Sequence, residues 1–149
     1  MGLDMSLSVK ESVYGNDADK DPYLGKFTRV ESTYEVGYWR KANHIHQWFV
    51  NNVQDGNDDC GLHHIGPEKL EEFRDTIRRA VESPTEAPSL FPTQSGFFYG
   101  STDYDKHYYD SFTYTLNMLK DLFQLLDGKD NGYDPDRKAY LTVYYSSSW

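Results

Sequence analysis

Two stretches of alternating hydrophobic and polar residues, one near each end of the chain, restrict the possible fold most. Residues 3–10 place apolar side chains at every second position, Leu3, Met5, Leu7 and Val9, and residues 140–145 (YLTVYY) alternate in the same way. Successive side chains of a β-strand point to opposite faces of its sheet. Both stretches therefore predict strands with one buried face, and two strands at opposite ends of the chain can pair with each other.

The sequence between these strands contains three stretches with helical spacing and further strand signals. Apolar residues recur every three or four positions, as on one face of a helix, over residues 38–54, 67–83 and from Ser101 or Thr102 to Asp127. Residues 30–38 and the aromatic run 96–100 are predicted strands, residues 14–25 a surface loop and residues 132–135 a turn. The order predicts an α+β fold, with a small, mostly antiparallel sheet, about three helices packed on one face, and N- and C-terminal strands.

Length and cysteine content restrict the organisation and the compartment. The 149 residues fit one domain, and Cys60 has no second cysteine with which to form an intrachain disulfide, which favours a reducing compartment. We find neither a secretory signal nor an apolar run of the length that crosses a bilayer. We therefore expect a single domain over residues 1–149, a cytoplasmic location and no membrane partner.

Charge and aromatic content restrict the partners. The net charge of −9 disfavours direct binding of nucleic acid, because neutralising phosphates requires Lys and Arg. The chain has 13 Tyr, and aromatic residues make up 16% of it. Tyrosine is favoured in ligand pockets and interfaces, although here it could equally replace Phe and Leu in the core.

A polar and aromatic block at the start of the first predicted helix is the best candidate for a ligand site. A guanidinium, an amide and two large rings lie close together here, and could hold a phosphate and stack on a base. The turn before the third predicted helix can present backbone amides to an anion. The predicted ligand-binding residues are Tyr38, Trp39, Arg40, Asn43, His46, Ser101 and Thr102. In the alternative interpretation, Trp39 belongs to the core and Arg40 is solvated.

Histidines and acidic residues near Cys60 offer a weaker metal-binding hypothesis. Zinc requires about four converging nitrogen or sulfur ligands, and the candidates are His46, Asp59, Cys60 and His63. In a helix, His44 and His46 would point roughly 200° apart, so they cannot share one metal. We therefore expect no metal and no cofactor.

The sequence contains little that indicates catalysis. His107 could form a general-base pair with Asp103 or Asp110, but such spacing is also typical of a surface ion pair. No activated nucleophile accompanies these residues. Whether the chain is an enzyme stays open, and a non-enzymatic role is the expectation.

Several word-like blocks resemble a family of small phage and bacterial proteins that has no established activity. The blocks are residues 1–5 (MGLDM), 36–43 (VGYWRKAN), 45–46 (IH), 48–50 (WFV), 58–61 (DDCG), 92–98 (PTQSGFF), 100–102 (GST), 104–105 (YD) and 147–149 (SSW). They cover nearly the whole chain. The sequence departs from the family pattern at Ser6, where an aromatic residue is usual. The resemblance implies a phage context and a bacterial host cell.

Phage accessory proteins of this size often act against host defence, and this analogy ranks the functions. We expect a homo-oligomeric protein that binds and sequesters a nucleotide-derived small molecule. The first alternative is an acidic inhibitor of a host defence protein that mimics nucleic acid, which predicts acidic side chains along one exposed stripe. The second alternative is a metal-dependent hydrolase.

Overall fold

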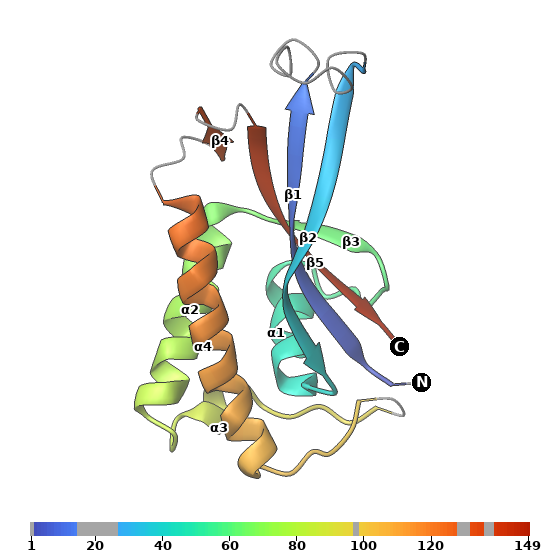
Figure 1. Cartoon of the computed structure of the whole chain (residues 1–149). Helices are drawn as coiled ribbons and strands as arrows, with labels where there is room; N and C mark the ends of the chain where they lie inside the picture. Colours follow the sequence, from blue (N-terminus) through green and yellow to red (C-terminus); the bar gives the residue numbers. More distant parts are fainter. Residues whose placement is uncertain (1, 15–26, 97–98, 128–131, 136–138) are drawn as a thin grey trace.

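The fold is an antiparallel sheet covered on one face by helices (Figure 1). The computed structural model describes residues 2–14, 27–96, 99–127, 132–135 and 139–149. The elements in chain order are β1 (Asp4–Tyr14), β2 (Arg29–Arg40), α1 (Asn43–Asn52), β3 (Leu62–Ile65), α2 (Pro67–Glu82), α3 (Ala87–Leu90), α4 (Lys106–Leu126), β4 (Tyr133–Asp134) and β5 (Ala139–Ser148). The strand order is β2-β1-β5-β3, with β4 paired to β5. The predicted α+β class is confirmed.

The two terminal strands form the centre of the sheet. β1 and β5 pair antiparallel, from Asp4 opposite Ser148 to Ser12 opposite Tyr140. The two ends of the chain therefore lie side by side (Figure 1). Pairing between the predicted terminal strands is confirmed.

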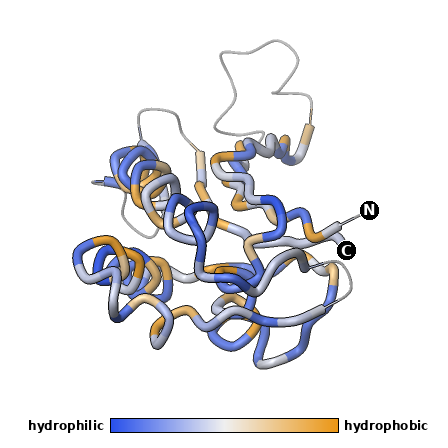
Figure 2. The backbone as a smooth tube through the Cα atoms, turned by 90° about the horizontal axis from the view of Figure 1, so that it is seen from below, coloured by the Kyte–Doolittle hydropathy of each residue, from blue (hydrophilic) through white to orange (hydrophobic). Residues whose placement is uncertain are grey.

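The core lies between this sheet and the helices. Alternate residues of the central strands are fully buried, including Leu7 in β1 and Tyr145 in β5. α2 contributes Phe73 and α4 contributes Phe112, and both side chains are almost wholly inaccessible to solvent. In Figure 2 the helices show hydrophobic positions interleaved with hydrophilic ones, as expected where one face of a helix is buried.

α1 is short and is buried on most of its circumference. Its ten residues include three buried polar side chains, Asn43, His44 and His46. Buried polar groups are costly unless they are hydrogen-bonded. Each of the three has hydrogen-bond partners in the structure. α1 is therefore the helix that places hydrogen-bonded polar side chains in the interior.

The first predicted helix begins later than its sequence pattern indicated. Residues 38–40 belong to β2, and α1 begins at Asn43. A bulge between Leu7 and Ser8 shifts the register of β2 on β1 by one residue. The shift turns Tyr38 outward and Trp39 inward. The spacing of Trp39 from the apolar residues of α1 therefore resembled a helical face, although Trp39 lies in a strand.

The third predicted helix also begins later, at Lys106. The Asp105 carboxylate accepts a hydrogen bond from the Tyr108 backbone N–H at 3.0 Å and caps this helix. Ser101 and Thr102, where the sequence placed the start of this helix, precede it in a segment without regular secondary structure. Ser101, Thr102 and Asp105 are all residue types that can cap a helix, so residue type alone could not show which of them does so.

Other predictions differ from the structure in detail or fall outside it. β3 was not predicted, α3 is an additional single turn, and residues 133–134 of the predicted turn form β4. Residues 15–25 of the predicted loop, and Phe97 and Phe98 of the predicted aromatic strand, lie outside the described residues. Tyr99 and Gly100 are not in a strand. In the described part of the chain no helix is sufficiently long and apolar to cross a bilayer.

Candidate functional site

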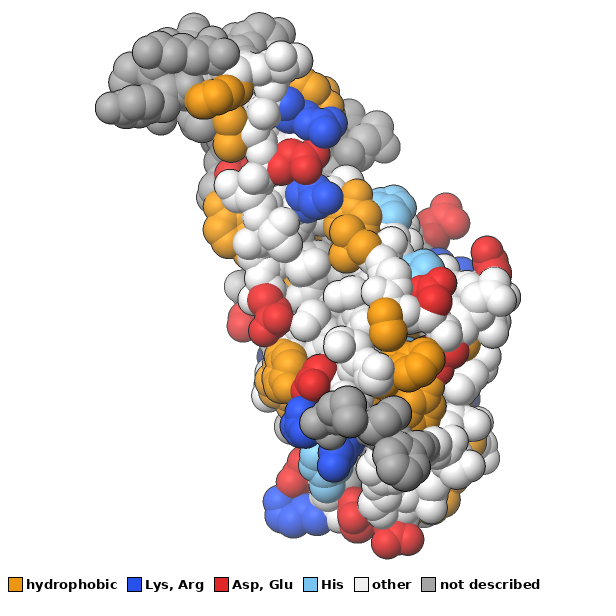
Figure 3. All heavy atoms as spheres, turned by 90° about the vertical axis from the view of Figure 1, so that its right-hand side faces the viewer, with side chains coloured by type: hydrophobic (Ala, Val, Ile, Leu, Met, Phe, Trp, Pro, Cys, Tyr) orange, Lys and Arg blue, Asp and Glu red, His pale blue; other side chains and the backbone are white. Residues whose placement is uncertain are grey.

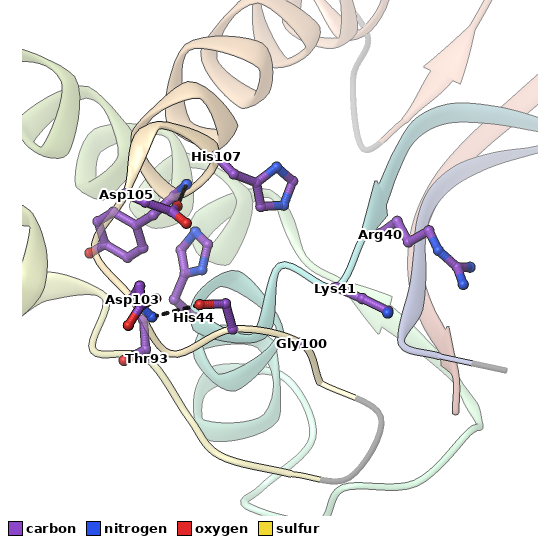
Figure 4. A pocket seen from close by; sticks show the side chains of 10 residues that line it. Arg40, Lys41, His44, Thr93, Gly100, Asp103, Asp105 and His107 are labelled. Atoms are coloured by element: carbon purple, nitrogen blue, oxygen red, sulfur yellow. Dashed lines mark hydrogen bonds between the residues drawn. The ribbon is translucent and has the colours of Figure 1, made fainter.

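A pocket of about 260 Å³ lies where the N-terminal ends of α1 and α4 meet. We call it the His44 pocket. It is lined by Arg40, Lys41, His44, Thr93, Gly100, Ser101, Asp103, Asp105, His107 and Tyr108. Figure 4 shows the rings of His44, from α1, and His107, from α4, close to each other, whereas the charged ends of Arg40 and Lys41 point away from His44. The polar inner end of the pocket is therefore formed by the starts of two helices.

His44 is held in one orientation by a chain of hydrogen bonds. Its Nε2 lies 2.8 Å from the Ser111 Oγ. The Ser111 hydroxyl donates its proton to the Tyr108 carbonyl oxygen at 2.5 Å. The Ser111 Oγ must therefore accept the hydrogen bond from His44 Nε2. His44 is therefore the donor through Nε2, and in the neutral ring Nδ1 carries a lone pair.

The Nδ1 atom of His44 is free to meet a ligand. It has no hydrogen-bond partner within the described residues, and the side chain is only 3% exposed. Among those residues the polar side-chain atom that is both fully enclosed and unpaired is Gln54 Oε1. Nδ1 is thus unpaired but not fully closed off from solvent, and it belongs to a side chain that lines the pocket.

Burial keeps the His44 ring neutral at physiological pH. The pKa of His44 is lowered from 6.5 to about 3, mainly by burial and also by the nearby His107, while Asp105 opposes the change. A group with this pKa carries no charge at pH 7. The pocket therefore presents a fixed, uncharged hydrogen-bond acceptor.

One wall of the pocket stores backbone strain. Lys41, between β2 and α1, has a φ of 56°, a left-handed conformation that costs a residue with a Cβ about 1–2 kcal/mol. Its side chain lies against Gly100, where an added Cβ would approach the Lys41 Cβ to 2.9 Å. Gly100, with a φ of 84°, is therefore the residue that allows this close approach.

Asn43 fixes the segment around Gly100 that lies against Lys41 in this wall. Its Nδ2 donates to the carbonyl oxygens of Tyr99 at 3.0 Å and Ser101 at 2.9 Å. Its Oδ1 accepts from the Gln94 backbone N–H at 2.8 Å. Asn43 is 1% exposed, so it positions the wall and does not line the pocket.

The structure brings only part of the predicted ligand site together. Arg40 and Ser101 line the pocket. Arg40 also donates to the Asp4 carboxylate at 2.7 Å, and Tyr38 donates to the same carboxylate on the outer face of the sheet. Trp39 is buried and donates from its indole nitrogen to the Thr115 hydroxyl at 2.8 Å. Neither ring is placed to stack on a ligand in the pocket, as the sequence hypothesis required.

The remaining two predicted residues have structural partners. The His46 Nε2 lies 2.8 Å from an Asp58 carboxylate oxygen, and its Nδ1 lies 2.6 Å from the Tyr145 hydroxyl. His46 is 0% exposed. The Thr102 carbonyl accepts from the Thr93 hydroxyl at 2.9 Å. His46 thus joins α1 to β5, and Thr102 helps to fold the pocket wall.

The metal and general-base hypotheses gain no support from the geometry. Asp59 pairs with His63 at 2.6 Å and Cys60 is exposed, while His46 is engaged by Asp58 and Tyr145. Among the described residues, no group of three or more His, Cys, Asp and Glu side chains could hold a metal ion.

The candidate general-base pair does not form within the described residues. Asp110 pairs with Lys106 at 2.5 Å. Within the described residues His107 makes no hydrogen bond with Asp103 or Asp110, so neither carboxylate orients its ring.

His44 is the residue that the sequence reasoning missed. It was considered only as a metal ligand, and its role depends on Ser111, 67 positions further along the chain. Sequence spacing within α1 contains no signal for that contact.

Comparison with family models, with curated proteins and with solved structures found no match to this chain.

Proposed function

We propose that this chain is a non-catalytic protein that binds a nucleotide-derived small molecule in the His44 pocket. The proposal depends on one observation: a buried, oriented histidine lines the pocket, and its Nδ1 has no hydrogen-bond partner among the described residues. Nδ1 is not fully enclosed, so a hydrogen bond that a ligand donates to it contributes about 0.5–1.5 kcal/mol to binding. Such a ligand therefore favours the bound state.

The properties of His44 suit binding better than catalysis. An efficient general base has a pKa near the working pH, where it both accepts and releases protons. The pKa of His44, about 3, makes it a poor base at pH 7. His107, the other histidine of the pocket, has no carboxylate partner among the described residues.

The outer edge of the pocket supports the choice of an anionic, nucleotide-derived ligand. Lys41 and Arg40 lie there, and Lys41 has no ion-pair partner within the described residues. The N-terminal ends of α1 and α4 add partial positive charge. A volume of about 260 Å³ is slightly below that of pockets that bury drug-sized ligands. A base is therefore small enough to enter, while a phosphate stays outside at the cations.

Isothermal titration calorimetry tests the proposal directly. The ligands are adenosine, AMP, ADP-ribose and a cyclic dinucleotide, each titrated into the wild-type protein and into His44→Gln. The Gln amide can still donate to Ser111 but offers no acceptor at the Nδ1 position. We expect binding to the wild type and a loss of about tenfold or more in His44→Gln, the equivalent of about 1.4 kcal/mol.

His64→Gln is the matched control, because His64 lies in β3 and packs against Tyr144 outside the pocket. It should bind like the wild type. Binding that is equally strong in all three proteins would place the ligand elsewhere. No heat with any of the four compounds would remove the proposal.

The acidic-mimic alternative has less support. On α2 the acidic residues are interleaved with bases and pair with them, as Lys69 does with Glu72 and Arg78 with Asp75. On the face shown in Figure 3, acidic side chains are scattered and mixed with Lys and Arg, and do not follow one stripe. A duplex mimic requires a regular row of negative charge.

In the phage context expected from the sequence, such a binder would withhold a signalling nucleotide from a host defence protein. This part of the proposal has its own test. Mass spectrometry of small molecules that co-purify from bacterial cells should detect a nucleotide derivative with the wild type. The same preparation of His44→Gln should contain less of it.

A further inference from the structure

We infer that the end of the ligand that enters the His44 pocket carries an amino group on an aromatic ring, as adenine does. This inference rests on the proposed function and names the chemical class of the buried group. It follows from a count of hydrogen-bond donors and acceptors at the inner end of the pocket.

Of the three hydroxyl groups that line the pocket, two already use their protons, whereas the third, Ser101, accepts the Asp103 backbone N–H through its Oγ and keeps its own proton. Tyr108 donates to the Phe91 carbonyl oxygen at 2.8 Å, and Thr93 donates to the Thr102 carbonyl oxygen at 2.9 Å. Neither proton is available to a ligand without breaking a bond within the protein.

The acceptors, in contrast, have capacity to spare. His44 Nδ1 is unpaired within the described residues. One Asp105 oxygen accepts the Tyr108 backbone N–H, which leaves the second oxygen without a partner in that part of the chain. The Asp103 carboxylate likewise makes no hydrogen bond or ion pair with the described residues. His44 is the buried acceptor of this set and therefore calls for a ligand that donates, whereas Asp103 and Asp105 are exposed residues.

Charge favours a neutral donor over an ammonium ion. Arg40 is paired with Asp4, so Lys41 and the positive ends of two helices are the charges that offset Asp103 and Asp105 among the lining residues. The lining is mostly apolar, and the Tyr108 ring packs tilted against His44 with 4.3 Å between the ring centroids. An aromatic ring with an exocyclic amino group matches these walls, and its two N–H bonds can reach His44 and a carboxylate.

Adenosine and purine riboside provide the sharpest test, because they differ only in the 6-amino group. We expect the wild type to bind adenosine at least about tenfold more tightly than purine riboside, since the analogue leaves His44 Nδ1 unpaired. In His44→Gln the preference for adenosine over purine riboside should disappear. It should partly return in His44→Asn, whose side-chain oxygen can occupy the Nδ1 position.

The outcomes separate this inference from the proposed function. If adenosine and purine riboside bind the wild type equally well, the pocket takes nucleosides and the amino-group inference is wrong. If neither nucleoside binds, and AMP, ADP-ribose and the cyclic dinucleotide give no heat either, the proposed function is wrong and the inference falls with it. Tyramine, an aromatic ligand with an ammonium group, is the third probe, and tighter binding of tyramine than of adenosine would overturn the choice of a neutral donor. The wild-type comparison requires no variant to fold.

Discussion

At the scale of single residues, the tautomer of His44 is the feature from which most consequences follow. Ser111 fixes the proton on Nε2, and burial keeps the ring neutral. Proton-detected NMR on ¹⁵N-histidine protein distinguishes the two tautomers. We expect His44 to show the Nε2–H form and to keep it throughout the neutral pH range.

The depressed pKa of His44 predicts a specific loss of stability in acid. Above pH 6.5 the ring is neutral in both the folded and the unfolded state. Between pH 6.5 and about 3 the unfolded state binds a proton that the folded state excludes. The free energy of unfolding therefore falls as the pH falls through this range, by up to about 1.4 kcal/mol per pH unit.

Denaturant unfolding of the wild type and His44→Gln at a series of pH values measures this loss. Other groups titrate in both proteins, so the difference between the two curves isolates His44. The wild type should lose stability more steeply below pH 6.5. Parallel curves would show that His44 titrates normally.

Lys41 combines backbone strain with a position at the edge of the pocket. Lys41→Gly removes the strain of the left-handed φ, which stabilises the folded state by about 1–2 kcal/mol. The greater flexibility of glycine in the unfolded chain offsets about 0.5–1 kcal/mol of this stabilisation. The melting temperature should stay the same or rise. Affinity for AMP should fall roughly two- to fivefold, as expected for an exposed ion pair, and affinity for adenosine should not change. Equal losses for both ligands would show that Lys41 does not contact the phosphate.

At the scale of secondary-structure elements, the joint between α1 and β5 holds α1 on the sheet. His46 accepts or donates at both ring nitrogens, and Phe49 stacks on Tyr145 with 3.9 Å between the ring centroids. Tyr145→Phe leaves a buried histidine nitrogen unpaired, so we expect a loss of about 1–3 kcal/mol in the free energy of unfolding.

Tyr34→Phe is the control for that change, because Tyr34 is 48% exposed. It should alter stability by no more than about 0.5 kcal/mol. Thermal and denaturant unfolding report both values. A Tyr145→Phe variant as stable as the control would mean that the hydroxyl contributes nothing to the joint.

Elements with a strong local period could be predicted, and those defined by tertiary contacts could not. The alternation of residues 3–10 indicated β1, and Pro67 together with the stripe through Phe73 indicated α2. β3 has four residues and exists because it pairs with β5. Likewise, the pocket depends on α1 meeting α4, a contact between segments over 60 positions apart, so Arg40 and Ser101 were found while His44 was missed.

At the scale of the whole molecule, the sheet depends on its final strand. β5 pairs with β1, β3 and β4, so removing it leaves these strands without their shared neighbour. A chain of residues 1–138 should show no cooperative unfolding transition in circular dichroism. Deletion of Trp149 alone should be tolerated, because that side chain is 44% exposed and makes one hydrogen bond to Asp58 at 3.2 Å. Cooperative unfolding of the shorter chain would show that β1 and β2 form a core with the helices unaided.

The antiparallel pairing of the first and last strands also gives the molecule a direction of mechanical weakness. The start of β1 and the end of β5 emerge at the same end of the pair, with Asp4 opposite Ser148. Tension between the two termini therefore peels the strands apart one hydrogen bond at a time. Handles at Tyr14 and Trp149 would instead load the whole β1–β5 ladder in shear. In an optical trap the second geometry should rupture at the higher force.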